Sequence, residues 1–476
     1  MLFNSFSFAI FLPIVFILYW LIPDRFRWVL LLIASYYFYM SWNVKYVVLI
    51  LFTTFISYLA SIILSKTDSV VIKKTVVAIA AIASLGVLFV FKYFNFFSES
   101  IVNLAKCVSI SLHPITLKLL LPVGISFYTF QTLSYVIDVY RGNVEPEQNF
   151  GIYATFISFF PQLVAGPIER TSNLLPQIKE SKQFDYDEAT YGLKLMAWGF
   201  FKKLAIADVI SQYVDNVYAN ISGSTALDIL IAIFFFTIQI YCDFSGYSDI
   251  AIGTARLFGI RLMKNFSAPY FASSIREFWS RWHISLSTWF RDYVYIPLGG
   301  NRCSKVKNYR NLFITFLVSG LWHGANWTYV IWGAGHGILQ ILEKIFKVDA
   351  LRTKTAKVLR IVIVFILCNI LWVFFRASTI SDALLLFKHL ICDELNLYSL
   401  THVRSGIGIT TLAVTMVCIL FLAVFDKFSE KEDVIKRISS YKLVCRWGIY
   451  VALVVGTYFI YVNYGVSNAS FVYFQF

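Results

Sequence analysis

The sequence predicts an all-α membrane protein that crosses the bilayer many times. Hydrophobic residues make up 58% of the chain and charged residues only 14%, against about 25% charged residues in soluble globular domains. Apolar runs recur from end to end, and most approach the ~20 residues that a helix needs to cross the hydrocarbon. The runs are continuous rather than alternating, which favours helices over a β-barrel. A soluble fold of this length would leave too much apolar surface in water.

The runs predict about ten to twelve crossing helices within one integral-membrane domain, residues 1–476. The first run lacks the basic start and small-residue cleavage site of a signal peptide, so a retained first span is expected. Proline and glycine interrupt two runs, at Pro161 and Pro167 and again from Gly320 to Gly337. Broken helices are tolerated only beside protein or a water-filled cavity, which predicts short, broken and interfacial helices around a central cavity. The expected runs are 4–22, 28–42, 44–64, 75–97, 119–138, 150–166, 190–210, 226–253, 310–342, 359–375, 405–425 and 446–463.

The charge and the cysteine content exclude several kinds of partner and site. The net charge is +14, but no soluble domain is expected to carry the basic face of a nucleic-acid reader, so nucleic acid is excluded as a partner. Residues 256–310 hold ten basic side chains against two acidic ones. Such an excess marks cytoplasmic loops, so this basic interfacial segment is expected to face the cytoplasm. The seven cysteines are scattered without a C-x-x-C pair, which predicts neither a disulfide framework nor a metal site.

His323 lies inside an apolar run, where an ionisable side chain is a functional hypothesis by default. Asn326 follows three residues later and is expected on nearly the same helix face. Its amide could then orient the ring or a substrate carbonyl. The pattern alone is explained equally well by a histidine that is hydrogen-bonded in a helix interface. Three further histidines lie in polar connections and carry little signal: His113, His389 and His402.

His283 is the second candidate, within the segment 278–302. Apolar residues recur there at helical period, and a polar stripe that includes His283 follows another face, which predicts one amphipathic helix. Such a helix either anchors the chain at the membrane surface or lines a cavity. The Leu-Gly-Gly-Asn sequence at 298–301 is predicted to be a turn. The stripes consist of Trp279, Trp282, Leu286, Trp289 and Tyr293, and of Arg276, Ser280, His283, Ser287 and Arg291.

Acidic residues end the long apolar run that begins near residue 226. Carboxylates at membrane depth need partners, and Asp243 and Asp249 lie in this run. Arg256 follows Asp249 by seven residues on the same helix face, so a structural ion pair between them is expected. Glu169 and Arg170 suggest a structural role of the same kind.

Motifs that are absent exclude several reaction classes. The sequence contains no Walker loop, no H-E-x-x-H and no G-x-S-x-G nucleophile elbow. ATP-driven transport, zinc hydrolysis and α/β-hydrolase chemistry are therefore not expected. What remains is a helical membrane protein with two intramembrane histidine candidates and a basic segment.

Taken together, several segments resemble the membrane-bound O-acyltransferase superfamily, and within it the alginate O-acetyltransferase branch. Blocks 278–302 and 319–337 carry the most specific similarity, which extends over most of the chain. The family's essential histidine maps onto His323 and its second motif histidine onto His283. Leu262, Met263 and Lys264 depart from many relatives, which carry proline before the Asn-Phe pair. The other segments are Gln162–Arg170, Tyr241–Gly253, Asn265–Tyr270, Phe374–Ala377 and Phe471–Phe476.

The resemblance implies an acyltransferase that takes an acetyl group from a cytoplasmic thioester, acetyl-CoA, towards hydroxyls of an extracytoplasmic polysaccharide such as alginate. His323 would be the general base or an acyl-histidine nucleophile. His283 and Asn326 would position the donor carbonyl or the acceptor. Lys305 and Lys307 are weak candidates for steering the anionic donor.

The implied setting is the cell inner membrane, with a separate extracytoplasmic acetyltransferase as partner and no bound cofactor. Two alternatives stay open. One is D-alanyl transfer from a carrier protein in teichoic-acid-type modification, because a related branch shares both histidine segments. The other is a transporter or channel with pore-lining histidines, although the sequence shows none of the internal repeats that many transporters have.

Overall fold

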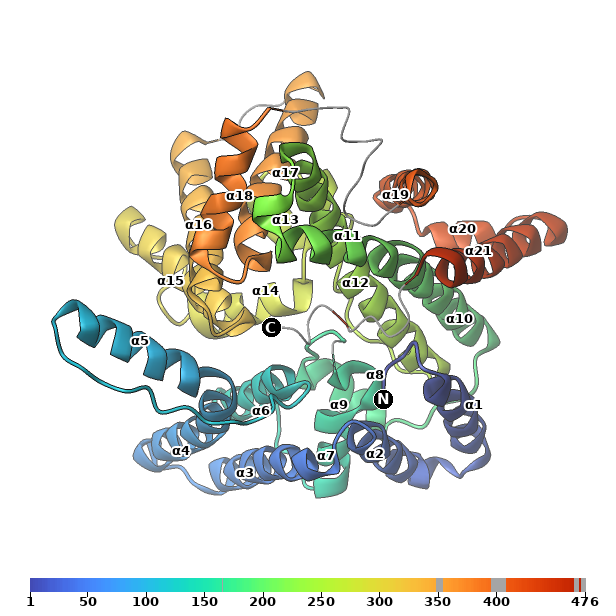
Figure 1. Cartoon of the computed structure of the whole chain (residues 1–476). Coiled ribbons are helices and arrows are strands. Elements are labelled where there is room, and N and C mark those ends of the chain that lie inside the picture. Colours follow the sequence, from blue (N-terminus) through green and yellow to red (C-terminus); the bar gives the residue numbers. More distant parts are fainter. Residues whose placement is uncertain (165, 348–353, 395–407, 466–470, 472–476) are drawn as a thin grey trace. The chain divides into compact units, whose positions relative to one another are not determined.

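The computed structural model describes residues 1–164, 166–347, 354–394, 408–465 and 471. Across these ranges the chain is built from helices and contains no strand (Figure 1), so the predicted all-α class is confirmed. His402 and residues 472–476 lie outside the described residues. The chain divides into two compact units, residues 1–193 with 251–263 and residues 194–250 with 264–476. Each unit is described here by itself.

The first unit collects most of the N-terminal helices. A close contact between α2 and α7 shows how tightly they pack, because a Cβ on Gly151 would lie 2.3 Å from the ring of Trp28. The helices of this unit are α1 (Phe6–Leu21), α2 (Asp24–Met40), η1 (Val44–Tyr46), α3 (Val47–Lys66), α4 (Val70–Leu88), η2 (Phe89–Tyr93), α5 (Phe94–Cys107), α6 (Ile125–Tyr140), α7 (Phe150–Ser158), α8 (Phe160–Leu163) and α9 (Thr171–Lys179).

Two helices, α10 (Tyr186–Phe200) and α12 (Ala226–Leu257), contribute residues to both units. The second unit contains all the histidine candidates that the structure describes, except His113. Its other helices are η3 (Phe201–Ala207), α11 (Asp208–Ala219), η4 (Ile221–Gly223), η5 (Pro269–Phe271), α13 (Ile275–Arg281), α14 (Ile284–Phe290), η6 (Arg291–Tyr295), α15 (Lys305–His323), α16 (Trp327–Phe346), α17 (Lys354–Arg376), α18 (Ile380–Cys392), α19 (Ile409–Ser429), α20 (Val434–Ser439) and α21 (Leu443–Tyr464).

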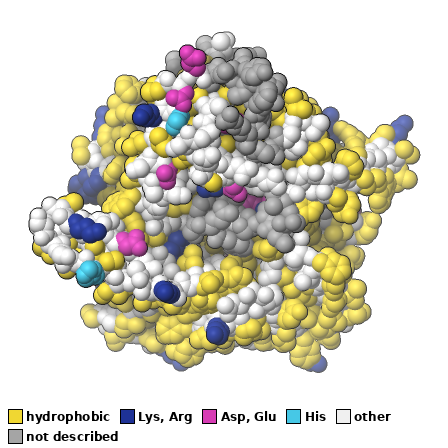
Figure 2. All heavy atoms as spheres, in the orientation of Figure 1, with side chains coloured by type: hydrophobic (Ala, Val, Ile, Leu, Met, Phe, Trp, Pro, Cys, Tyr) yellow, Lys and Arg dark blue, Asp and Glu magenta, His cyan; other side chains and the backbone are white. Residues whose placement is uncertain are grey.

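Within the described residues, six helical stretches are long and apolar enough to cross a membrane. Their outward faces carry apolar side chains, and Figure 2 shows hydrophobic side chains over much of the face that it draws. Fewer spans meet this criterion than the predicted ten to twelve. Runs 150–166 and 310–342 each break into two helices, and runs 4–22, 28–42 and 119–138 form helices of only 16 or 17 residues. The six stretches are Val44–Lys66, Val70–Cys107, Ala226–Leu257, Thr355–Arg376, Ile409–Ser429 and Leu443–Tyr464, and α1 is a shorter apolar helix.

The prediction of one amphipathic helix before the turn at 298–301 is wrong, because the helix breaks at His283. Helix α13 ends at Arg281 and α14 begins at Ile284, while His283 itself takes a left-handed backbone conformation with φ of 43°. No proline or glycine marks this break in the sequence. Long-range hydrogen bonds to Asn265 hold it, as described below. The turn predicted at 298–301 is present.

The apolar run over 310–342 folds back on itself as a hairpin of α15 and α16, the two neighbouring yellow helices of Figure 1. Helix α15 ends at His323, and Gly324 takes an extended conformation. Two glycines let the backbones meet, since a Cβ on Gly320 would lie 2.3 Å from the carbonyl oxygen of Tyr329 and one on Gly333 2.3 Å from that of Phe316. Asn326 therefore does not share a helix with His323, and its predicted placement on the same face is wrong.

Candidate active site

His323 is the last residue of α15 and is 4% exposed. Its imidazole packs among aromatic rings, with ring centroids 5.0 Å from Trp322, 4.9 Å from Trp332 and 5.3 Å from Phe375. These rings come from α15, α16 and α17. The hairpin and the following span thus bury His323 inside the second unit, as its position in an apolar run predicts.

His283 is fully buried. Trp322 neighbours both histidines, with ring centroids 6.1 Å from His283 and 5.0 Å from His323. The Nδ1 atom of His283 lies 3.1 Å from the Oδ1 atom of Asn265. Burial lowers the pKa of His283 to about 3, so the imidazole is neutral at physiological pH. The two predicted histidines therefore belong to one aromatic cluster.

Asn326 is the N-cap of α16 rather than a neighbour of the His323 ring. Its Oδ1 accepts a hydrogen bond from the amide of Thr328 at 3.0 Å, and its Nδ2 donates to the carbonyl of Ser378 at 2.8 Å. Asparagine is among the preferred N-cap residues because its side chain satisfies a free amide of the first turn. Through these contacts Asn326 caps the start of α16 and ties the connection between α15 and α16 to the carbonyl of Ser378. A contact with substrate stays a prediction.

His336 on α16 is a buried histidine of this site that sequence reasoning missed. It is 0% exposed, and the indole Nε1 of Trp279 donates to its Nδ1 at 3.2 Å. Trp332 neighbours both His336 and His323, with ring centroids 5.0 Å and 4.9 Å apart. The available signal was a second histidine in the apolar block 319–337, in the Gly-Ala-Gly-His-Gly sequence at 333–337.

A cavity of about 670 Å³ lies in the second unit, walled by α13, α14, η6, α15 and α16. Trp279 lines it, as does Ser319, which is one helical turn before His323 on α15. Three exposed cations, Arg276, Arg291 and Lys344, belong to its wall. Its size and mixed lining are typical of a small-molecule site. The hydroxyl and amide side chains of the wall are Ser280, Ser287, Thr288, Tyr295, Asn301, Thr315, Ser319 and Gln340.

Lys305 and Lys307 lie in the first turn of α15, where both are exposed. Neither is among the residues that line the cavity. The prediction that Lys305 and Lys307 steer the donor therefore has only their charge in its favour. Arg276, Arg291 and Lys344 are charged and also line the cavity. The described structure thus offers nearer cations than the two that the sequence singled out.

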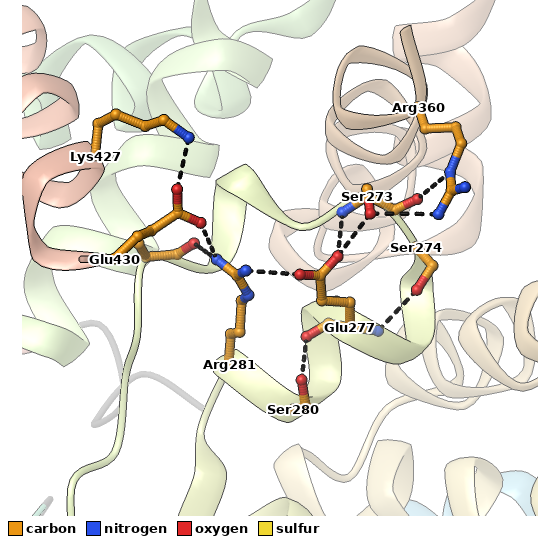
Figure 3. A network of polar contacts seen from close by, with 9 residues as sticks. Ser273, Ser274, Glu277, Ser280, Arg281, Arg360, Lys427 and Glu430 are labelled. Atoms are coloured by element: carbon orange, nitrogen blue, oxygen red, sulfur yellow. Dashed lines mark hydrogen bonds and ion pairs between the residues drawn. The ribbon is translucent and has the colours of Figure 1, made fainter. Parts of the chain in front are cut away.

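A polar network fixes α13, which carries Trp279, to two membrane helices (Figure 3). Glu277 accepts hydrogen bonds from the amide and hydroxyl of Ser273 at 2.7 and 2.8 Å, and it pairs with Arg281 at 2.6 Å. Arg281 also pairs with Glu430 after α19, and Arg360 of α17 donates to the carbonyl of Ser273. Part of the basic segment is therefore used to hold α13 in place.

The carboxylates of α12 have partners, but not the predicted one. Asp249 pairs with Lys202 at 2.7 Å, and Asp243 pairs with Lys203 at 2.6 Å. The expected pair between Asp249 and Arg256 is wrong. Both lysines come from η3, a π-helical stretch whose wider turn lets two successive lysines reach α12.

In the first unit, Arg256 pairs with Glu188 at 2.8 Å. Glu169 is fully buried and accepts hydrogen bonds from Asn173 and from the amide of Met263 at 2.6 and 2.5 Å. Burial raises the pKa of Glu169 to about 7. Both side chains thus support packing of the first unit, in line with the structural role expected for Glu169.

Helical spans around buried imidazoles, with a cavity of polar and cationic lining one turn from His323, are typical of a membrane enzyme with a small-molecule site. A family model described as MBOAT, membrane-bound O-acyltransferase family, matches residues 147–380. The "probable alginate O-acetylase AlgI" of Pseudomonas syringae pv. tomato is 41% identical over 440 residues, 90% of this chain and 82% of that protein. The chain therefore belongs to the membrane-bound O-acyltransferase family, and it is an acyltransferase.

Two further relatives show how the similarity is distributed. The peptidoglycan O-acetyltransferase of Helicobacter pylori is 36% identical over 437 residues, 84% of this chain and 81% of that protein. The teichoic acid D-alanyltransferase of Bacillus subtilis is 29% identical over 234 residues, 47% of this chain and 59% of that protein. Similarity to the O-acetylating relatives thus extends over nearly twice as much of the chain.

Proposed function

We propose that this protein is a membrane O-acetyltransferase that moves an acetyl group from cytoplasmic acetyl-CoA towards hydroxyls of an extracytoplasmic polysaccharide. The observation that carries the proposal is the buried His323, one helical turn from a cavity with cations in its wall. Relatives named for O-acetylation of alginate and of peptidoglycan match most of the chain. Their substrates are both glycans, which supports a sugar hydroxyl as the acceptor.

His323 is the general base of the proposed reaction. Its imidazole removes the proton of the acceptor hydroxyl as that oxygen attacks the carbonyl carbon of the thioester. The bond from that carbon to sulfur breaks, and the leaving thiolate takes up the proton. A positioned base of this kind contributes roughly 10²- to 10⁴-fold to the rate. The aromatic rings around His323 exclude water, which limits hydrolysis of the thioester.

The donor occupies the cavity beside α15 in this proposal. Phosphate groups of coenzyme A would pair with Arg276, Arg291 and Lys344, which are exposed at its wall. The narrow pantetheine arm would extend past Ser319 towards His323. A volume of about 670 Å³ suits a large part of such a molecule.

The cellular setting is proposed with the reaction. The protein lies in the cell inner membrane, and a separate extracytoplasmic acetyltransferase is its partner in acetylating the polymer. The many apolar spans and the names of the relatives support this setting. D-alanyl transfer is the second candidate, but its named relative matches only 47% of the chain.

Transfer can be tested with the full chain in lipid nanodiscs, supplied with radiolabelled acetyl-CoA and sugar oligomers. We expect acetylated product with the wild type and at least a ~100-fold lower rate with His323→Ala, the loss typical of a missing base. His113→Ala is the control, because His113 is exposed in a connection of the first unit, whereas His323 belongs to the second. Wild-type rates in His323→Ala would refute its role. Transfer from a D-alanyl carrier protein but not from acetyl-CoA would favour the second candidate.

A further inference from the structure

The hydrogen bonds around Asn265 decide which ring nitrogen of His283 carries the proton. Asn265 is 1% exposed and His283 0% exposed. The Oδ1 atom of Asn265 lies 3.2 Å from the backbone nitrogen of Ser285, 2.9 Å from the Ser285 hydroxyl and 3.1 Å from His283 Nδ1. A backbone N–H can only donate. The side-chain atom that faces Ser285 must therefore be the amide oxygen.

The opposite end of the Asn265 amide agrees with this orientation. Its Nδ2 atom donates to the hydroxyl of Ser248 on α12 at 3.1 Å. Because the oxygen faces His283, Nδ1 of the ring has to be the donor. A neutral imidazole carries one proton, so Nε2 keeps its lone pair. The burial that lowers the pKa of His283 maintains this neutral form.

The backbone of His283 is strained in this arrangement. Its φ is 43°, a left-handed conformation that is uncommon outside glycine. The amide of Ile284 donates to the carbonyl of Asn265 at 2.9 Å, and the amide of Ser267 donates to the carbonyl of Arg281 at 2.9 Å. Two backbone bonds and the side-chain bonds of Asn265 thus hold the break between α13 and α14 open. Strain that is held by its surroundings in this way is common at functional sites.

We propose that Asn265 is a positioning residue that fixes His283 as the Nδ1–H tautomer, so that His283 holds the hydroxyl-bearing acceptor rather than the carbonyl of the donor. A lone pair on Nε2 accepts a hydrogen bond from an O–H group. It cannot donate one to a thioester carbonyl. The inference rests on the proposed function and decides between the two positioning roles that the sequence left open for His283.

The tautomer can be read directly by ¹⁵N NMR of the full chain, labelled with ¹⁵N-histidine in nanodiscs. Comparison with His283→Gln identifies the signal of His283. We expect a protonated Nδ1 and an unprotonated Nε2 in the wild type, and loss of this pattern in Asn265→Leu. A protonated Nε2 in the wild type would overturn the proposal. This measurement needs no turnover, so it stands even where acetyl transfer fails and the proposed function is refuted.

Kinetics test the second half of the proposal, with the sugar oligomer that the wild type acetylates. Asn265→Leu should raise the KM for this acceptor about tenfold, the effect of one lost buried hydrogen bond, and leave the KM for acetyl-CoA unchanged. Asn265→Asp keeps an oxygen towards Nδ1 and should stay within about threefold of the wild type. A rise in the acetyl-CoA KM instead would contradict the assignment of His283 to the acceptor.

Ser248→Ala is the matched control, because it removes the Nδ2 contact of Asn265 and leaves Oδ1 in place. It should lower stability without changing the acceptor KM. Equal effects of Ser248→Ala and Asn265→Leu would show a merely structural role and overturn the proposal. If Asn265→Leu does not reach the membrane, Asn265→Asp and the wild-type NMR signal carry the test.

Discussion

Two buried histidines of the second unit are held in opposite tautomers by their neighbours. His283 donates from Nδ1 to an amide oxygen, whereas His336 accepts at Nδ1 from the indole of Trp279, which can only donate. His336 therefore carries its proton on Nε2. The Nε2 atom of His283 is therefore an acceptor and the Nε2 atom of His336 a donor. In each ring a single hydrogen bond at Nδ1 sets this difference.

We expect His336 to act on the cavity through Trp279, which lines it. His336→Leu removes the acceptor of the indole N–H and should raise the KM for acetyl-CoA about fivefold to tenfold, the usual effect of leaving a buried donor unpaired. His336→Asn restores an acceptor oxygen and should recover most of the loss. Steady-state kinetics in nanodiscs measure both. Equal KM values for the two variants would show that the indole contact is unimportant.

The cations of the cavity wall give a second prediction at this scale. The double variant Arg276→Gln with Lys344→Gln should raise the KM for acetyl-CoA, most strongly at low salt, because screening shortens the reach of exposed charges to about 8 Å at physiological ionic strength. Lys305→Gln with Lys307→Gln is the matched control, since both lysines are exposed and lie outside the wall. A larger effect in the control pair would place donor steering at the start of α15.

At the scale of elements, the α15–α16 hairpin depends on two glycines that face one another. A Cβ on Gly333 would lie 3.1 Å from the Cα of Gly320 and 2.3 Å from a carbonyl oxygen. Backbone atoms cannot swing aside as a flexible side chain can. The hairpin also sets the end of α15, and with it the position of His323.

Gly320→Ala should therefore destabilise the protein by about 1–3 kcal/mol, the usual cost of overpacking, despite the better helix propensity of alanine. Gly448→Ala in α21 is the control, because nothing lies within 4 Å of its added Cβ. Thermal unfolding in nanodiscs compares the two. A melting temperature of Gly320→Ala equal to that of Gly448→Ala would mean that the hairpin is not closely packed there.

At the scale of the whole molecule, the uneven charge predicts which side of the membrane the basic segment faces. Ten of the basic residues lie in 256–310, and positive charge is retained on the cytoplasmic side. The donor route proposed above requires the same orientation, because coenzyme A is a cytoplasmic anion in this scheme.

Cys303 reports on this orientation, since it lies in the basic segment and is partly exposed. With Cys303 as the sole cysteine, we expect no reaction with a membrane-impermeant thiol reagent in intact cells and clear labelling in inverted vesicles. A second variant with Cys445 as the sole cysteine tests access to the exposed residue at the start of α21. Labelling of Cys303 from outside intact cells would reverse the topology and the donor route with it.

The sequence alone was enough to predict the helical membrane class, the burial of His323 and the need of the α12 carboxylates for partners. Composition and run length are local properties, and they report directly whether a segment is buried in protein or lipid. The most specific motif blocks also lie within the residues 147–380 that match the family model. Even so, the twelve apolar runs correspond to six long spans among the described residues, because hydropathy shows neither a break inside a run nor the length of the helix that forms.

Only the tertiary structure decided where helices break and which polar groups pair. The break at His283 depends on Asn265, 18 residues earlier, and the partner of Asp249 is Lys202, 47 residues earlier. Asn326 caps α16 rather than extending α15, because α15 ends before it, at Gly324. His336 is hydrogen-bonded to the indole of Trp279, 57 residues earlier in the chain. Hydrogen bonds between residues so far apart in the sequence depend on how the helices pack in space. Helical periodicity, which is a local pattern, does not predict them.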